Sequence, residues 1–122
     1  MYELTVTTTF SSAHNIRGYE GACERLHGHN WRVEVFVCAE ELDRLGMAMD
    51  FKRLKAETRS VIDGLDHCYL NETPPFDVEN ATAENIARFI YKKLSDALKG
   101  SNVRVSRVRV WESDSAAASY SE

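Results

Sequence analysis

Two long segments in which apolar and polar residues alternate constrain the fold of this chain most. The first runs from Tyr2 to His14, and the second runs from His27 to Val37. A period of two is typical of a strand with one buried face, so we expect two β-strands. Both apolar faces continue into imidazoles, because His14 ends the first and His27 and His29 begin the second. A hairpin of these strands would bring the three histidines together.

Three clustered imidazoles indicate a metal site. Three neutral histidines with an open fourth position are a typical ligand set of catalytic zinc, and zinc is the preferred metal for an all-imidazole set. The alternative is that the histidines are interior residues with ordinary hydrogen-bond partners. Because all three lie on matching strand faces, we predict one Zn²⁺ per protomer, bound by His14, His27 and His29.

Composition excludes several other classes of protein. The chain has 122 residues, of which 43% are hydrophobic and 28% charged, which predicts one soluble domain over residues 1–122. A net charge of -4 without a lysine or arginine tract argues against a nucleic-acid partner. We expect no membrane span, because no apolar run approaches about 20 residues, and the N-terminus lacks a signal-peptide pattern. Three cysteines without a CxxC motif favour the reducing cytoplasm.

The rest of the chain predicts two helices and further strands. Asp50 and Thr82 are expected to cap the two helices, and Gly100 to stop the second. A strand is expected over 102–112, with a bulge where its apolar phase shifts. Residues 113–122 form either a short edge strand or a frayed end. The predicted fold class is α+β, with an antiparallel sheet of about four strands and two helices on one face.

Two further sites carry reactive groups. Cys23 lies four residues before His27, and it is either an apolar filler or a thiolate that acts as base or nucleophile. Asp66 and His67 follow the first predicted helix. They either end that helix, where a protonated histidine meets the carbonyl dipole, or form a proton relay. The residues alone favour the helix end.

Glu112 falls on the apolar side of the last predicted strand. A buried carboxylate is costly unless it is paired. Its partner is either an arginine of the same strand (Arg104, Arg107 or Arg109) or a ligand with adjacent N–H donors, since a carboxylate accepts two parallel hydrogen bonds.

Taken together, these motifs resemble the 6-pyruvoyl-tetrahydropterin synthase / 6-carboxy-tetrahydropterin synthase family. The carrying residues occur in family order over nearly the whole chain. They are Phe10-Ser11-Ser12-Ala13-His14, Cys23-Glu24-Arg25-Leu26-His27-Gly28-His29, Met49-Asp50-Phe51 with Leu54-Lys55, Asp66-His67 with Leu70-Asn71, Thr82-Ala83-Glu84-Asn85, and Glu112.

The resemblance implies a fold and an assembly. The fold is the tunnelling fold, whose protomers form a trimer around a shared barrel. Two trimers commonly stack into a homohexamer, which gives exposed strand edges a partner. Active sites of the family lie near subunit contacts.

The resemblance also implies residue roles. The three histidines would bind zinc, and Cys23 would be the catalytic base. Asp66 and His67 would form a proton-transfer pair. Glu112 would anchor the amino-pyrimidine edge of the pterin, and backbone around Thr82 would complete that pocket. The implied substrate is 7,8-dihydroneopterin triphosphate.

The family includes enzymes that form different products from this substrate. The compact chain resembles bacterial 6-carboxy-tetrahydropterin synthases, which release acetaldehyde and triphosphate and supply the queuosine pathway. One alternative is 6-pyruvoyl-tetrahydropterin. Another is 6-hydroxymethyl-dihydropterin for folate synthesis, for which Glu24 would be the alternative base; Glu24 is otherwise a solvated loop carboxylate. A further alternative is a non-catalytic metal- or pterin-binding module.

Overall fold

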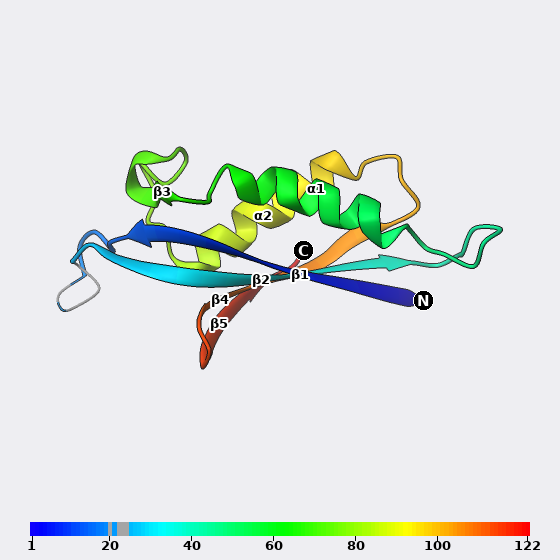
Figure 1. The fold of residues 1–122 in the computed structure, drawn as a ribbon, viewed down its shortest axis with the longest axis horizontal. Coiled ribbons are helices and arrows are strands. Elements are labelled where there is room, and N and C mark those ends of the chain that lie inside the picture. The colour runs from blue at the N-terminus through cyan, green and yellow to red at the C-terminus, as the bar shows by residue number, and fades with distance from the viewer. Residues whose placement is uncertain (20, 22–24) are drawn as a thin grey trace.

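The computed structural model describes residues 1–19, 21 and 25–122, so Cys23 and Glu24 lie outside the described residues. Two helices cover one face of a twisted β-sheet (Figure 1). In chain order the elements are β1 (Tyr2–His14), β2 (His27–Ala39), α1 (Phe51–Asp63), β3 (Cys68–Tyr69), the short 3₁₀ helix η2 (Leu70–Glu72), α2 (Ala83–Ala97), β4 (Arg104–Ser113) and β5 (Ala116–Tyr120).

The β1–β2 hairpin forms the centre of the sheet. The two strands pair antiparallel along their whole length, from Tyr2 opposite Ala39 to His14 opposite His27. The predicted pairing of the two alternating segments is therefore confirmed. Their buried faces point toward the helices, and Phe10 stacks on Trp31 with ring centroids 5.8 Å apart.

The prediction of an antiparallel sheet of about four strands is wrong in one respect. Within the described residues the sheet has five strands in the order β3-β1-β2-β4-β5, and it is mixed. The difference arises at β3, which pairs parallel with Ser12 and Ala13 of β1. A strand of two residues is too short to show an alternation, so no sequence pattern could have predicted it. The sheet of the single chain is open, and the trimeric barrel stays a prediction.

Both predicted helix caps are confirmed. The Asp50 side chain accepts a hydrogen bond from the backbone N–H of Lys52 at 2.8 Å, and Thr82 accepts one from Asn85 at 3.1 Å. Such bonds satisfy N–H groups that have no partner inside the helix. Helix α2 ends at Ala97, and the turn that follows reaches Gly100, whose φ of 79° is readily adopted only by glycine.

The predicted bulge lies at Ser106. Phe36 pairs with Arg107 and Val37 pairs with Val105, so Ser106 is left without a partner on β2. One extra residue reverses the phase of the strand, which lets Val105 before it and Val110 after it both face the core. The same phase carries Glu112 to the helix-covered face. The last segment is a strand, β5, which confirms one of the two predictions for the tail.

The core lies between the sheet and the two helices. Leu54 and Ile62 of α1 and Ile86, Ile90 and Leu94 of α2 are fully buried against the valines of β2 and β4. This packing fixes α2 above the sheet, with its N-terminus near the end of β1 where His14 lies. Among the described residues, no helix is long and apolar enough to cross a membrane.

Removing the Thr82 cap should destabilise the protein measurably. We expect Thr82→Ala to lower the free energy of unfolding by about 1 kcal/mol, because the N–H of Asn85 loses its acceptor. Thr82→Ser keeps a hydroxyl and should retain most of that stability. Urea unfolding at one pH and protein concentration measures both variants. Equal losses in the two would contradict a capping role.

Candidate metal centre

The three histidines form one cluster. His14 and His27 are opposite each other in the β1–β2 ladder, and His29 is opposite Ser12. Because alternate residues of a strand share a face, all three rings project to the helix-covered side. Their centroids lie 4.5 Å (His14 to His27), 4.7 Å (His27 to His29) and 5.0 Å (His14 to His29) apart. The predicted convergence of these side chains is confirmed.

Backbone carbonyl groups fix the orientation of two rings. Nδ1 of His14 donates to the carbonyl oxygen of Ala81 at 2.7 Å, and Nδ1 of His27 donates to that of Arg25 at 2.7 Å. A neutral imidazole that donates through Nδ1 carries its free lone pair on Nε2. Carbonyl groups commonly orient metal-binding histidines in this way.

The Nε2 atoms point at one another. Nε2 of His14 lies 3.0 Å from Nε2 of His27. Two lone pairs at this distance repel unless a proton or a cation lies between them. Nε2 of His29 is also buried, and it has no hydrogen-bond partner among the described residues. Three converging Nε2 lone pairs are what a bound cation needs, so the residues present fit a metal site.

Glu112 lies beside the histidines. Its Oε1 is 3.5 Å from Nε2 of His29, and the ligand atoms of the four residues all lie within 4.8 Å of one another. The group can hold a metal ion. Among the described residues, the side chain beside Glu112 is therefore the imidazole of His29 rather than an arginine of β4. Arg109 instead approaches Glu34, and Arg107 lies over Phe36.

Burial favours the neutral form of the imidazoles. Loss of solvation lowers the pKa of His14 from its ordinary value, and the hydrogen bond to Ala81 opposes this only in part. Loss of solvation also lowers the pKa of His29, against the opposing charge of Glu112. Neutral rings keep the lone pairs that a metal needs.

The surroundings of the cluster are apolar on one side and helical on another. The Trp31 ring meets those of His14 and His29 edge-on, with centroids 5.0 Å away in each case. Ala81, whose carbonyl orients His14, immediately precedes the α2 cap Thr82. Thr82 is therefore the residue next to a direct contact with the cluster, and its role in binding a substrate remains a prediction.

Two asparagines hold the chain where it leaves His14. The Asn71 amide accepts from the N–H of Asn15 at 3.0 Å and donates to its carbonyl at 2.9 Å. The Asn80 amide makes the same pair of bonds with Arg17, at 3.0 and 3.1 Å. Each asparagine side chain thus makes the two hydrogen bonds that the backbone of a paired strand would make. The sequence analysis did not predict these asparagine contacts or the two carbonyl groups that orient the histidines. A backbone carbonyl group leaves no trace in the identity of its residue. Asn71, by contrast, was already part of the Leu70-Asn71 motif.

Asp66 and His67 contact each other, as the family resemblance implies, and they are not part of the described metal cluster. Helix α1 already ends at Asp63, so the expectation that this pair ends the helix is wrong. Nδ1 of His67 is 2.9 Å from Oδ1 of Asp66, and the His67 side chain is 82% exposed. The N–H of Ser11 donates to Asp66 at 2.9 Å and, as the largest cause, lowers the pKa of that carboxyl; His67 and Arg59 lower it further. Ser11 lies on the opposite strand face from His14. A relay role for the pair remains a prediction.

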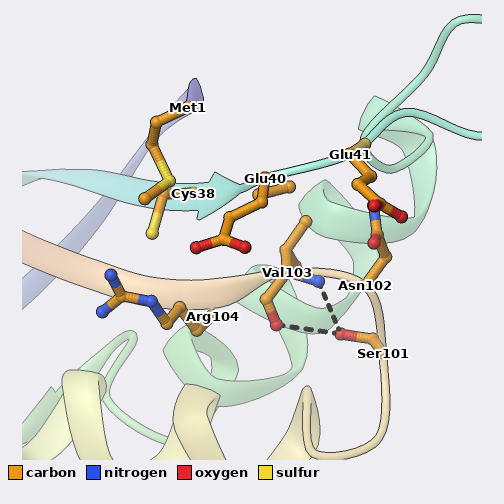
Figure 2. A pocket seen from close by; sticks show the side chains of 9 residues that line it. Met1, Cys38, Glu40, Glu41, Ser101, Asn102, Val103 and Arg104 are labelled. Atoms are coloured by element: carbon orange, nitrogen blue, oxygen red, sulfur yellow. Dashed lines mark hydrogen bonds between the residues drawn. The ribbon is translucent and has the colours of Figure 1, made fainter.

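The pocket in Figure 2 is a different place. It is lined by Met1, Cys38, Ala39, Glu40, Glu41, Ser101, Asn102, Val103 and Arg104. Tyr2 pairs with Ala39 and His14 pairs with His27, so this pocket lies at the opposite end of the hairpin from the histidines. At its rim the Ser101 hydroxyl donates to the carbonyl of Val103 and accepts from the N–H of Val103. The pocket contains no residue that we predicted to act in the site.

Comparisons with known proteins identify the family. The family model for 6-pyruvoyl tetrahydropterin synthase matches residues 3–122. The chain is 40% identical over 94 residues to a 6-carboxy-5,6,7,8-tetrahydropterin synthase of Synechocystis, covering 73% of this chain and 71% of that protein. It is 36% identical over 104 residues to a dihydroneopterin monophosphate aldolase of Pyrococcus furiosus, covering 85% and 83%.

A solved structure shows the same fold. The 6-pyruvoyl tetrahydropterin synthase of Caenorhabditis elegans superposes with a TM-score of 0.87 at 25% identity, covering 99% of this chain and 95% of that one. The chain belongs to the 6-pyruvoyl tetrahydropterin synthase family. The resemblance seen in the sequence and the prediction of an enzyme are thereby confirmed.

The metal-free protein should lose stability as the pH falls. The folded state holds the pKa of His14 and His29 below the unfolded value of about 6.5, so the unfolded chain binds more protons as pH drops from 7.5 toward 5.5. Urea unfolding after chelator treatment measures this loss. We expect His14→Gln to reduce the pH dependence and His67→Gln, on the surface, to preserve it. An unchanged dependence in His14→Gln would contradict the assignment.

Proposed function

We propose that this chain is a zinc-dependent 6-carboxy-5,6,7,8-tetrahydropterin synthase. Its substrates would be 7,8-dihydroneopterin triphosphate and one water, and its products 6-carboxy-tetrahydropterin, acetaldehyde and triphosphate. The observation that carries the proposal is the convergence of three histidine Nε2 atoms at the end of the β1–β2 hairpin, where His14 and His27 face each other at 3.0 Å and His29 Nε2 is buried with no partner among the described residues. The Synechocystis relative, which bears this activity in its name, supports the choice of reaction.

The cluster explains why a metal is needed. The reaction must remove a proton from a carbon that bears a hydroxyl, and such a C–H is a poor acid. Zinc held by His14, His27 and His29 would act as a Lewis acid on the side-chain hydroxyls of the substrate. Burial lowers the pKa of His14 and His29, and Nδ1 hydrogen bonds orient His14 and His27, so lone pairs for the metal are ready in advance.

Separate groups are needed for protons that leave and arrive at different carbons. We assign Cys23 as the base that takes the side-chain proton, and His67 as the acid that returns one to the ring. Asp66 would hold His67 through the 2.9 Å contact at Nδ1, which leaves Nε2 to exchange the proton. The Ser11 N–H keeps Asp66 ionised for this task.

Substrate recognition is assigned to the neighbours of the cluster. We propose that Glu112 accepts the paired N–H donors of the amino-pyrimidine edge, with backbone near Thr82 completing the pocket. Oε1 of Glu112 lies 3.5 Å from His29, and Thr82 directly follows Ala81, whose carbonyl accepts from His14. Both residues therefore lie beside the proposed metal centre, which supports a role in binding the substrate there.

Assembly would complete the site. The described cluster contains His14, His27, His29 and Glu112 but not His67, whose side chain is 82% exposed. We propose a homohexamer of two trimers, in which subunit contacts bring His67 and the cluster together and the trimeric barrel covers the sheet edges. We treat residues 1–122 as one tunnelling-fold domain and place the enzyme in the cytoplasm and the queuosine pathway.

A second candidate function is cleavage of the pterin side chain to 6-hydroxymethyl-dihydropterin. The Pyrococcus furiosus relative is named as an aldolase acting on dihydroneopterin monophosphate, which is the specific observation in its favour. Glu24, next to Cys23, would be the base for that route. The 6-pyruvoyl product is the third form of the same chemistry, and the family model bears its name. The enzyme names of the relatives speak against a non-catalytic binding module.

Metal content tests the first part of the proposal. After chelation and reloading, we expect about one zinc per chain near neutral pH, lost as the histidines protonate below about pH 6. His27→Ala should lose the ion because it removes one converging Nε2 atom. His67→Ala is the control and should retain it. Atomic absorption measures both, and full zinc retention by His27→Ala would remove the basis of the proposed site.

Product identity tests the second part. Incubation of the zinc-loaded protein with 7,8-dihydroneopterin triphosphate should yield 6-carboxy-tetrahydropterin and acetaldehyde, identified by mass spectrometry. Cys23→Ala should abolish this product by removing the base. Glu24→Ala should remove only a hydroxymethyl product. Loss of both products in Glu24→Ala would refute the separate roles, and no turnover by the zinc-replete oligomer would refute the synthase proposal.

A further inference from the structure

The position of Glu112 is at odds with a single role in binding the pterin. The hydroxyls of the substrate side chain and the amino-pyrimidine edge lie at opposite ends of the pterin ring system. A carboxylate that holds the pyrimidine edge must therefore stand a ring system away from the metal. In the structure Oε1 of Glu112 instead lies 3.5 Å from Nε2 of His29, inside the cluster.

This separation matches that of two ligands on one ion. Zinc bonds to nitrogen and oxygen of about 2.0–2.2 Å place tetrahedral ligands about 3.3–3.6 Å apart. The distance between His29 Nε2 and Glu112 Oε1 falls in this range, and the 3.0 Å between the Nε2 atoms of His14 and His27 is somewhat shorter. The remaining separations reach at most 4.8 Å, a difference that small side-chain rotations can close.

Exposure shows where a substrate can reach the cluster. His14 is 1% exposed, and Trp31 behind it is fully buried. The side chains of His29 and Glu112 are 20% and 35% exposed. Among the described residues of the cluster, the carboxylate thus stands on the open side. Glu112 is also the last residue but one of β4, so its side chain can swing away without disturbing the core.

We propose that Glu112 is a fourth metal ligand in the substrate-free protein. It would complete a His₃Glu set with His14, His27 and His29, and a substrate hydroxyl would displace it. The released carboxylate would then be free to accept the N–H donors of the pyrimidine edge. One residue thereby closes the metal site at rest and binds the pterin during the reaction. This inference rests on the metal centre proposed above, since it assigns a role toward the same ion.

Displacement gives the exchange a chemical purpose. A closed four-ligand set resembles a structural site, which resists loss of the ion, whereas a catalytic site needs an open position. A carboxylate ligand can provide both properties if it leaves only when the substrate supplies a hydroxyl for the ion and an N–H pair for the carboxylate. The ion is retained between turnovers, and it becomes accessible when the carboxylate has another partner.

Zinc affinity without substrate is the first test. We expect Glu112→Gln to bind zinc at least about tenfold more weakly than the unmodified protein, because loss of even an outer-shell partner costs 10- to 100-fold. Asp114→Asn, which removes the same charge two residues later, should stay within about twofold. Competition with a chromophoric chelator measures all three proteins, after circular dichroism has shown that each is folded.

Cobalt substitution tests the displacement. We expect the visible spectra of the cobalt-loaded protein and of Glu112→Gln to differ without ligand, and to converge when 7,8-dihydroneopterin saturates both. In the unmodified protein alone, addition of 7,8-dihydroneopterin should change the cobalt spectrum. That measurement keeps the test valid even if the variant does not fold.

The outcomes separate this inference from the proposed function. Unchanged zinc affinity in Glu112→Gln would overturn the assignment of Glu112 as a fourth ligand. If His27→Ala loses zinc in the same experiments, the proposal of a histidine metal centre still stands. Cobalt spectra of the unmodified protein and of Glu112→Gln that still differ when 7,8-dihydroneopterin saturates both would overturn the displacement, because Glu112 would then stay on the ion. A cobalt spectrum of the unmodified protein that does not change on adding 7,8-dihydroneopterin would overturn it as well. Zinc retention by His27→Ala would instead overturn the metal centre itself.

Discussion

The register of the β1–β2 hairpin is the constraint on which the rest of the site depends. It sets His14 opposite His27 and places His29 two residues along the same face. A shift by one residue would turn every side chain of one strand to the other face, so the apolar core and the histidine cluster are specified together. Burial of Val33, Val35 and Val37 against the helices therefore also maintains the donor geometry, and the site needs no separate scaffold.

The bulge at Ser106 determines in the same way which side chains of β4 face the core. Without the extra residue, the valines on one side of Ser106 would face away from the core, and Glu112 would lie on the opposite face from the histidines. Ser106 itself is held by its hydroxyl, which donates to the carbonyl of Phe36 at 3.1 Å. A single irregularity thus reconciles the packing of β4 with delivery of a carboxylate to the cluster.

The sequence predicted what depends on periodicity and on capping residues. The alternating strands, the caps Asp50 and Thr82, the bulge and the convergence of the histidines all follow from patterns within short windows. It did not predict β3, which is too short for a pattern, and so it missed the parallel pairing that makes the sheet mixed. The approach of Glu112 to His29 and the carbonyl of Ala81 beneath His14 depend on how distant segments meet, and no local window records that. Cys23 and Glu24 lie outside the described residues, so their predicted roles rest on the sequence alone.

The cluster also links metal binding to the stability of the fold. Burial holds the pKa of His14 and His29 below the ordinary value, and carbonyl groups orient the rings of His14 and His27 so that their Nε2 atoms face each other. This arrangement opposes folding in the absence of an ion. An ion that binds the folded state and not the unfolded chain removes this repulsion and adds its own binding free energy to folding. Because His14 anchors β1 to the segment before α2 through Ala81, the stabilisation extends to the contact between the sheet and the helix. The same arrangement that prepares the metal for chemistry therefore holds together the end of the hairpin from which the site is built.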